Sequence, residues 1–228
     1  MHDSPPSEMF SRSTSVFLCG DSRPLLNWVA YALIAAHSAG LVWTNIQLED
    51  EVPDDADLLS TKLLPPDRFL TVSPKELAPD DFAGNVALGG LVRSDEPPDV
   101  VRRFADFLRL PLHTQALLSR LPRDGTAVVL VLSNGHRIAA LYTTATVAPT
   151  VRSIVEAGAS LLMTWADAPP GGRLAFEHVL HLRGNAPAAW RDAVLRVEKG
   201  SSSGPLRTGA EFRLGDWPMV ASILGKSL

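Results

Sequence analysis

Residues 14–50 constrain the fold of this chain more than any other stretch, because they read in succession as strand, turn, helix and strand. Residues 16–19 are all apolar, and the Gly-Asp-Ser-Arg-Pro of residues 20–24 then interrupts the run. Proline suits the first turn of a helix, where its missing N–H would have no partner. Residues 25–36 are apolar nearly all round, which predicts a buried helix. We therefore expect a βαβ unit with two parallel strands and a right-handed crossover.

The rest of the chain predicts further strands and helices of the same kind. A length of 228 residues suits one large domain, which we place at residues 14–228, with a flexible N-terminal tail at residues 1–13. Residues 126–132 are apolar on both faces, as a buried parallel strand should be. A helix over 149–157 and a buried strand over 160–165 are expected next.

The last part of the chain changes to an alternation of apolar and polar residues, which is typical of antiparallel strands with one buried face. The alternating stretches are residues 173–182, 189–198 and 210–214. The predicted fold class is therefore α/β, with a mostly parallel central sheet flanked by helices and a C-terminal antiparallel hairpin.

Composition and charge argue against several classes of protein. The formal net charge is −4 and no basic stripe is present, so we expect no nucleic-acid partner. A single cysteine gives no disulfide framework and no cysteine-based zinc site. The apolar run Trp28 to Ala36 is too short to span a bilayer, and residues 1–13 lack the pattern of a signal peptide. These features predict a cytoplasmic protein with no membrane association.

Four stretches together resemble a known family. They are residues 16–22, residues 127–133, residues 151–165, and residues 176–184 with 191–199. In order, they look like a first strand with the opening of a phosphate loop, a strand that normally ends in a Mg²⁺-associated acidic residue, a helix–strand step, and a C-terminal β-hairpin. The chain thus resembles the KaiC-like branch of the RecA-like ATPases. This resemblance implies a three-layer α/β/α fold and a tendency to self-associate or to pair with another such domain.

The chain departs from that family at the positions that carry ATP chemistry. A phosphate-binding loop needs a glycine-rich turn and a lysine, whereas the turn at Gly20, Asp21, Ser22 and Arg23 has one glycine and no lysine. Residues 130–133 hold no aspartate, and a carboxylate at Glu49 or Asp50 does nothing alone. We treat the turn as vestigial and predict no catalytic residue, no cofactor and no metal. The predicted function is that of a pseudo-ATPase, a regulatory or signalling domain that acts through contacts with a protein partner or a second copy.

Two other functions remain open at this point. One is an α/β enzyme that uses the crevice at the C-terminal strand ends, around residues 20–22 and Ser133 to His136. Residues 134 and 135 are Asn-Gly, however, which indicate a turn first, and no nucleophile-elbow motif is present. The other is an atypical nucleotide binder in which Arg23 replaces the lysine, although arginine is a poor substitute in a tight phosphate cradle.

Several further residues have a structural interpretation that we prefer. Glu49 to Asp57 hold six carboxylates without the spacing of a calcium loop, so we interpret them as a solvated acidic loop. Cys19 ends an apolar strand and is interpreted as a small buried hydrophobe. His178 and His181 are three residues apart in a strand, so they point to opposite faces and share no metal.

Arginine and tryptophan side chains complete the candidates. The arginines of the C-terminal meander are interpreted as a solvated edge rather than as a basic patch, and they are Arg183, Arg191 and Arg196. The tryptophans near strand ends are expected to pack in the core, with a partner surface as the second possibility, and they are Trp43, Trp165, Trp190 and Trp217.

Overall fold

The structure is a computed structural model that describes part of the chain. The described residues are 9–10, 12–35, 41–45, 107–112, 114–116, 118–119, 127–132, 144–166, 168–184, 187–218 and 221–222. The predictions for Glu49 to Asp57 and for Ser133 to His136 lie outside these residues. Within the described residues, no helix is both long enough and apolar enough to cross a membrane.

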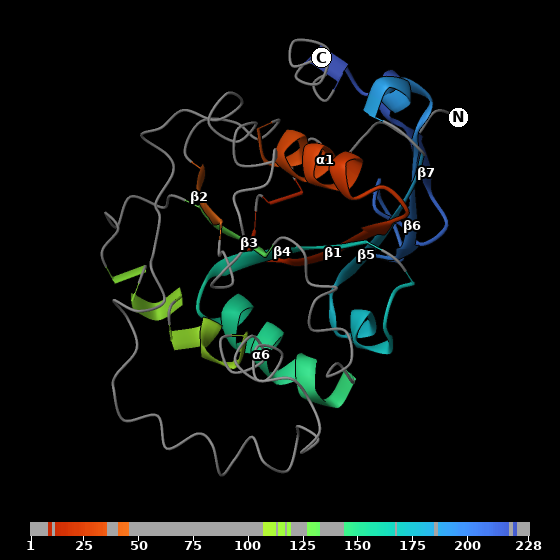
Figure 1. The fold of residues 1–228 in the computed structure, drawn as a ribbon. Helices are drawn as coiled ribbons and strands as arrows, with labels where there is room; N and C mark the ends of the chain where they lie inside the picture. Colours follow the sequence, from red (N-terminus) through yellow and green to blue (C-terminus); the bar gives the residue numbers. More distant parts are fainter. Residues whose placement is uncertain are drawn as a thin grey trace, which may run out of the picture.

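The core of the fold is one sheet of seven strands in the order β2-β3-β4-β1-β5-β6-β7 (Figure 1). The strands are β1 Ser15–Gly20, β2 Leu41–Asn45, β3 Ala127–Leu132, β4 Ala159–Ala166, β5 His178–Arg183, β6 Val194–Lys199 and β7 Glu211–Arg213. The strands from β2 to β5 pair in parallel, whereas β5–β6 and β6–β7 pair antiparallel. The α/β class, the mostly parallel sheet and the C-terminal antiparallel hairpin are therefore confirmed.

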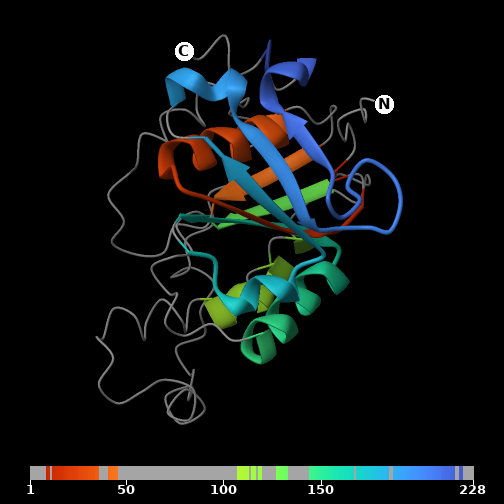
Figure 2. The ribbon, with the colours of Figure 1, turned by 90° about the vertical axis from the view of Figure 1, so that its right-hand side faces the viewer.

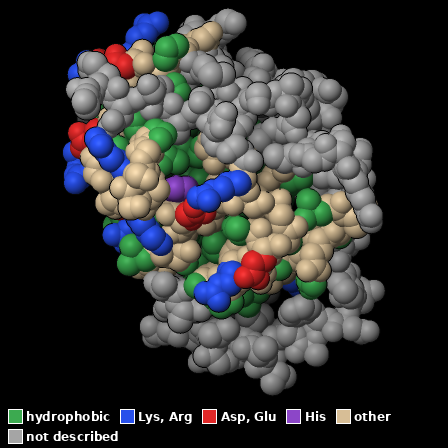
Figure 3. All heavy atoms as spheres, turned by 180° about the vertical axis from the view of Figure 1, so that it is seen from behind, with side chains coloured by type: hydrophobic (Ala, Val, Ile, Leu, Met, Phe, Trp, Pro, Cys, Tyr) green, Lys and Arg blue, Asp and Glu red, His purple; other side chains and the backbone are tan. Residues whose placement is uncertain are grey.

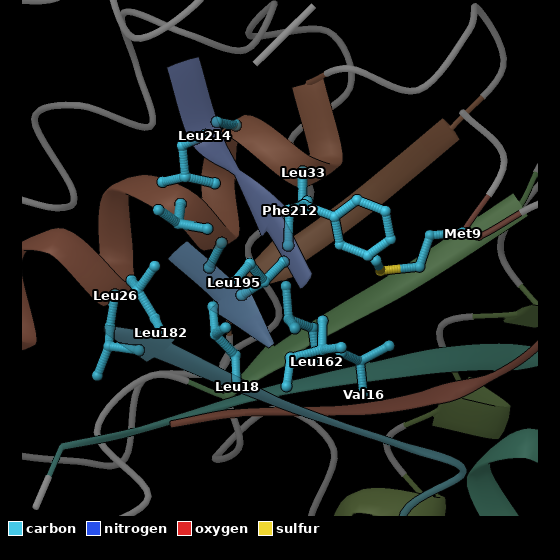
Figure 4. Packing of buried hydrophobic residues seen from close by; sticks show 14 of the residues in the cluster. Met9, Val16, Leu18, Leu26, Leu33, Leu162, Leu182, Leu195, Phe212 and Leu214 are labelled. Atoms are coloured by element: carbon cyan, nitrogen blue, oxygen red, sulfur yellow. The ribbon is translucent and has the colours of Figure 1, made fainter. Parts of the chain in front are cut away.

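The two principal helices lie on opposite faces of this sheet. Helix α1 (Arg23–Ala35) is above the sheet and helix α6 (Thr144–Glu156) is below it in Figures 1 and 2. The α1 side is packed by one apolar cluster that includes Leu18, Leu26 and Leu195, shown in Figure 4. The α6 side is packed by a second cluster, to which the helical residues 107–112 contribute Phe107 and Leu110. Strands β1 and β4 are buried along their whole length because they lie between the two clusters.

The first helical connection differs from a simple βαβ unit. Strands β1 and β2 belong to the same parallel sheet, as expected, but β3 and β4 lie between them. Strand β1 instead pairs with β4 on one side and with β5 on the other. The chain therefore crosses two strand positions through α1, and residues far apart in sequence become neighbours of β1.

Three predicted boundaries are wrong. The strand expected over 189–198 starts only at Val194, because Pro187–Asp192 form a 3₁₀ helix. Helix α6 begins at Thr144 rather than at residue 149, so Pro149 lies inside the helix, where burial of Val147 and Val151 holds the turns on either side of it. Gly158 ends this helix with a φ of 99°, in the left-handed region that favours glycine. The expected strand over 173–182 starts only at His178, because Gly171–Ala175 form a 3₁₀ helix, η3.

The N-terminal segment reaches the core on the α1 side. Met9 and Phe10 are buried in the same cluster as Phe212 of β7, and Figure 4 shows Met9 beside Phe212. Two more 3₁₀ helices, η4 (Pro187–Asp192) and η5 (Leu214–Asp216), flank the C-terminal strands. The two ends of the described chain thus meet in one cluster.

Candidate functional site

The turn between β1 and α1 is the place where an α/β fold of this kind would bind phosphate. Strand β1 ends at Gly20 and helix α1 begins at Arg23, so only Asp21 and Ser22 connect them. The backbone amide of Leu26 donates to the carbonyl oxygen of Ser22 at 2.9 Å, which closes the first helical turn directly after the strand. A two-residue connection has no length with which to wrap a phosphate group.

The turn also has few donors to offer an anion. Of the first four helical positions, Pro24 has no N–H and the amide of Leu26 is already bonded to Ser22. The exposed carboxylate of Asp21 stands beside the turn and repels negative charge. The few free amides and the carboxylate of Asp21 therefore disfavour a phosphate here, even though the N-terminal end of the helix dipole attracts anions.

Gly20 shows that the turn is closely packed as well as short. A Cβ atom built on Gly20 would lie 2.4 Å from the carbonyl oxygen of Leu182 in β5 and 3.2 Å from the Cβ of Leu182. Real Cβ atoms do not approach oxygen this closely, so the position requires glycine. The end of β1 is thus pressed against the backbone of β5, and the glycine serves strand packing.

A polar cluster lies on the α6 side of β5 and β6. The carboxylate of Glu198 lies close to two basic side chains. Its Oε1 is 3.3 Å from the Nδ1 of His181, and its Oε2 is 3.5 Å from the Nε of Arg173. Cys19 of β1 is the register partner of His181 of β5, so the thiol and the imidazole belong to the same side of the sheet. The fold therefore places a cysteine, a histidine and a carboxylate next to one another.

The state of the thiol decides what this cluster can do. Burial, together with the negative charge of Glu198, raises the pKa of Cys19 to about 12. The Sγ of Cys19 lies 3.5 Å from the carbonyl oxygen of Leu180, to which the thiol donates. The side chain is fully buried, so it is neither ionised at neutral pH nor reachable by a substrate. Cys19 is the small buried hydrophobe that the sequence predicts, despite its histidine neighbour.

A second polar network lies at the other end of the strands, where β1 and β5 begin. The carboxylate of Glu177 accepts bonds from the guanidinium of Arg12 at 2.6 Å and from the hydroxyl of Thr14 at 3.0 Å. The hydroxyl of Ser15 accepts the backbone N–H of Glu177 at 2.9 Å. These bonds hold the residues before β1 against the start of β5, which keeps the N-terminal segment in place.

His178 belongs to this second network and is buried. Its Nε2 lies 3.7 Å from Oε1 of Glu177, while its Nδ1 is buried without a hydrogen-bond partner in the described part of the chain. Burial lowers the pKa of His178, although the charge of Glu177 opposes the shift. We conclude that His178 is a neutral core histidine, on the opposite face of β5 from His181, as the sequence predicts.

The three arginines taken together from the sequence do not share one surface. Arg183 and Arg196 extend from β5 and β6 on the side away from the α1 cluster. Arg191 belongs to η4 and lies over the ring of Trp190, 5.1 Å from its centroid, and Trp190 is part of the α1-side cluster. The structure thus separates Arg191 from the other two.

The side chains of three of the four tryptophans near strand ends are described by the structure, and all three are core residues. Trp165, Trp190 and Trp217 are all buried, and Trp165 packs against Phe17 with 5.7 Å between the ring centroids. The side chain of Trp43 is outside the described part of the chain. These three tryptophans therefore offer no partner surface.

Residues that the sequence did not single out are Arg173, Glu177, Glu198 and Arg213. The alternation in β6 signals that Arg196 and Glu198 face outward, because Leu195 and Val197 between and beside them are buried. What sequence reasoning lacked was the strand register, which alone places Glu198 beside His181.

Neither a scan against protein families nor a search of curated proteins finds a match to this chain. Among the residues described by the structure, no group of three His, Cys, Asp or Glu side chains is placed to hold a metal ion. The functional argument therefore rests on the geometry of the turn and of the exposed surfaces.

Proposed function

We propose that this chain is a non-catalytic RecA/KaiC-like domain, a pseudo-ATPase that acts in regulation or signalling by binding a protein partner or a second copy of itself. The observation that carries the proposal is the two-residue connection between β1 and α1, where an active relative would need a glycine-rich loop and a lysine. The order of elements supports the family part of the proposal, since parallel strands with intervening helices come first and an antiparallel hairpin follows.

The chemistry of the described side chains supports the absence of catalysis in this proposal. The His181–Glu198 pair has the form of a base held by a carboxylate, but its neighbour Cys19 is a protonated, buried thiol. The thiol beside this base is therefore not available for it to activate. Contact with another macromolecule is then the function that the exposed surface supports best.

The test is isothermal titration of the full chain with ATP and MgCl₂, repeated with ADP. We expect no heat of binding up to millimolar nucleotide, because the turn presents few amides and no ammonium group. Binding in the micromolar range would overturn the proposal. Arg23→Ala is the matched variant, because loss of that binding in Arg23→Ala would establish the atypical nucleotide site instead.

A further inference from the structure

The outer side of the C-terminal hairpin forms a polar surface that no helix covers in the described part of the chain. Alternate residues of β5, β6 and β7 belong to the α1-side cluster, namely Leu180, Leu182, Leu195, Val197 and Phe212. The intervening side chains therefore project to the other side of the sheet. We call this surface the hairpin outer face, and its residues are His181, Arg183, Val194, Arg196, Glu198, Glu211 and Arg213.

The strand register arranges this face in two rows. Arg183 pairs with Val194, which pairs with Arg213 on its other side, so two arginines flank one valine. The next row is His181, Arg196 and Glu211, in the same strand order. Basic and acidic side chains lie interspersed on this side of the molecule (Figure 3, left).

The first row carries two charges that no other side chain in the described part of the chain neutralises. In the second row, the Nε of Arg196 lies 3.9 Å from the carboxylate of Glu211, and Glu198 is shared between His181 and Arg173. Arg183 and Arg213 are exposed, and neither forms an ion pair with any part of the chain that the structure describes. The chain as a whole carries a net charge of −4, so a pair of uncompensated arginines stands out against its surroundings.

Helix η3 covers one end of the hairpin outer face, and the other end is open in the described part of the chain. The ammonium group of Lys199 donates to the carbonyl oxygens of Leu174 and Phe176, both at 2.6 Å, and so holds η3 over the beginning of β5. The row of Arg183, Val194 and Arg213 lies at the other end of the strands, beyond this contact. Val194 there is only half-buried and gives the row an apolar centre.

We propose that this row of the hairpin outer face binds an acidic, extended segment of the partner protein, an inference that rests on the protein-binding function proposed above. Neighbouring strands are about 4.8 Å apart, so Arg183 and Arg213 stand roughly 10 Å apart across β6. In an extended peptide of the polyproline II form, which has three residues per turn, two carboxylates three residues apart lie on the same side and about 9 Å apart. Each carboxylate meets one guanidinium, which is suited to bidentate pairing, and the peptide backbone between them passes over Val194.

An acidic peptide fits this face better than a nucleic acid does. Glu211 lies in the next row and Glu198 in the row beyond it, so a continuous phosphate backbone that runs past the first row meets negative charge, whereas a peptide with two carboxylates stays on the first row. Addition of a partner strand to the free edge of the sheet is also disfavoured, because β7 has only three residues with which to pair. Side-chain recognition by the arginines is therefore the mode that the geometry supports.

The experiment measures fluorescence anisotropy of a labelled peptide with glutamate at every third position in a glycine–serine background. The peptide is titrated with the full chain at low and at physiological salt. The test variant is the double substitution Arg183→Ala and Arg213→Ala. The matched control is Arg152→Ala with Arg191→Ala, which removes the same charge from exposed arginines of α6 and η4.

We expect the unmodified chain to bind the peptide and to bind it less tightly as salt rises. The test variant should lose about fivefold or more in affinity, and the control should change by less than about twofold, since exposed ion pairs contribute modestly and only where they form. Circular dichroism and urea unfolding must show that both variants are folded.

Three results would overturn the inference. They are an absence of peptide binding at low salt, an equal loss in the control variant, and stronger competition by a single-stranded oligonucleotide than by unlabelled peptide. None of these results affects the ATP titration that tests the proposed function. A failure to bind the peptide counts against this inference, whereas micromolar binding of ATP counts against the proposed function.

Discussion

Replacing Gly20 by alanine tests the conclusion that the end of β1 is pressed against β5. The new Cβ would meet the carbonyl oxygen of Leu182 at 2.4 Å. An ordinary van der Waals contact between these two atoms is about 1 Å longer. The atoms that must move to reach it are backbone atoms of two paired, buried strands. No flexible side chain is available to give way.

The magnitude follows from two opposing effects. Overpacking of a buried site costs about 1–3 kcal/mol, and the rigid strands place Gly20→Ala in the upper part of that range. The reduced entropy of the unfolded chain returns about 0.4–1 kcal/mol. The overpacking is larger, so we expect the free energy of unfolding to fall by about 1–2 kcal/mol, equivalent to about 2–8 °C in Tm for a chain of this size.

The assay is urea unfolding followed by tryptophan fluorescence, with Gly171→Ala as the matched control. A Cβ at Gly171 meets nothing within 4 Å and its φ is not in the left-handed region, so only the entropic gain applies. The control should therefore be unchanged or slightly more stable than the parent. If Gly20→Ala were as stable as Gly171→Ala, the strands would separate easily and the argument that this turn has no room would be wrong.

Two further predictions concern titratable groups. Burial lowers the pKa of His178 below the ordinary histidine pKa of about 6.5, so near and below that pH the unfolded chain binds more protons than the folded chain. The free energy of unfolding should therefore fall as the pH drops from about 7.5 to about 5.5. His178→Gln should reduce that fall, as measured by urea unfolding at both pH values, and an equal fall in both proteins would count against a neutral buried imidazole. Cys19 is the only cysteine and its pKa is about 12, so a disulfide reagent at about pH 8 should label it only after unfolding, and rapid labelling of the folded chain would contradict the assigned burial.

The sequence predicts those parts of the fold that depend on local patterns. Strands β1, β3 and β4 are apolar runs bounded by breakers, and the left-handed Gly158 marks the end of α6. Local pattern fails where an apolar residue is not buried. Leu174 fits the alternation of a strand, yet it is 53% exposed in η3, so β5 begins later than the alternation indicates.

Strand order and register are less accessible to sequence reasoning because they depend on contacts between distant residues. Consecutive elements are usually neighbours, but β1 and β2 are separated by two strands. The juxtaposition of Cys19 with His181, and the row formed by Arg183, Val194 and Arg213, follow only from that order. The short turn after β1, by contrast, can be predicted from the sequence, because the residues that break the apolar run are local.

The position of β1 has a consequence for the synthesis of the chain. This strand is made first, but both of its neighbours, β4 and β5, lie more than half a chain later. At about 5–20 residues per second, a ribosome leaves an apolar strand without a partner for about seven to thirty seconds. Nascent β1 is therefore a natural target for a holding chaperone, and the domain assembles its sheet only when nearly all of its residues have emerged.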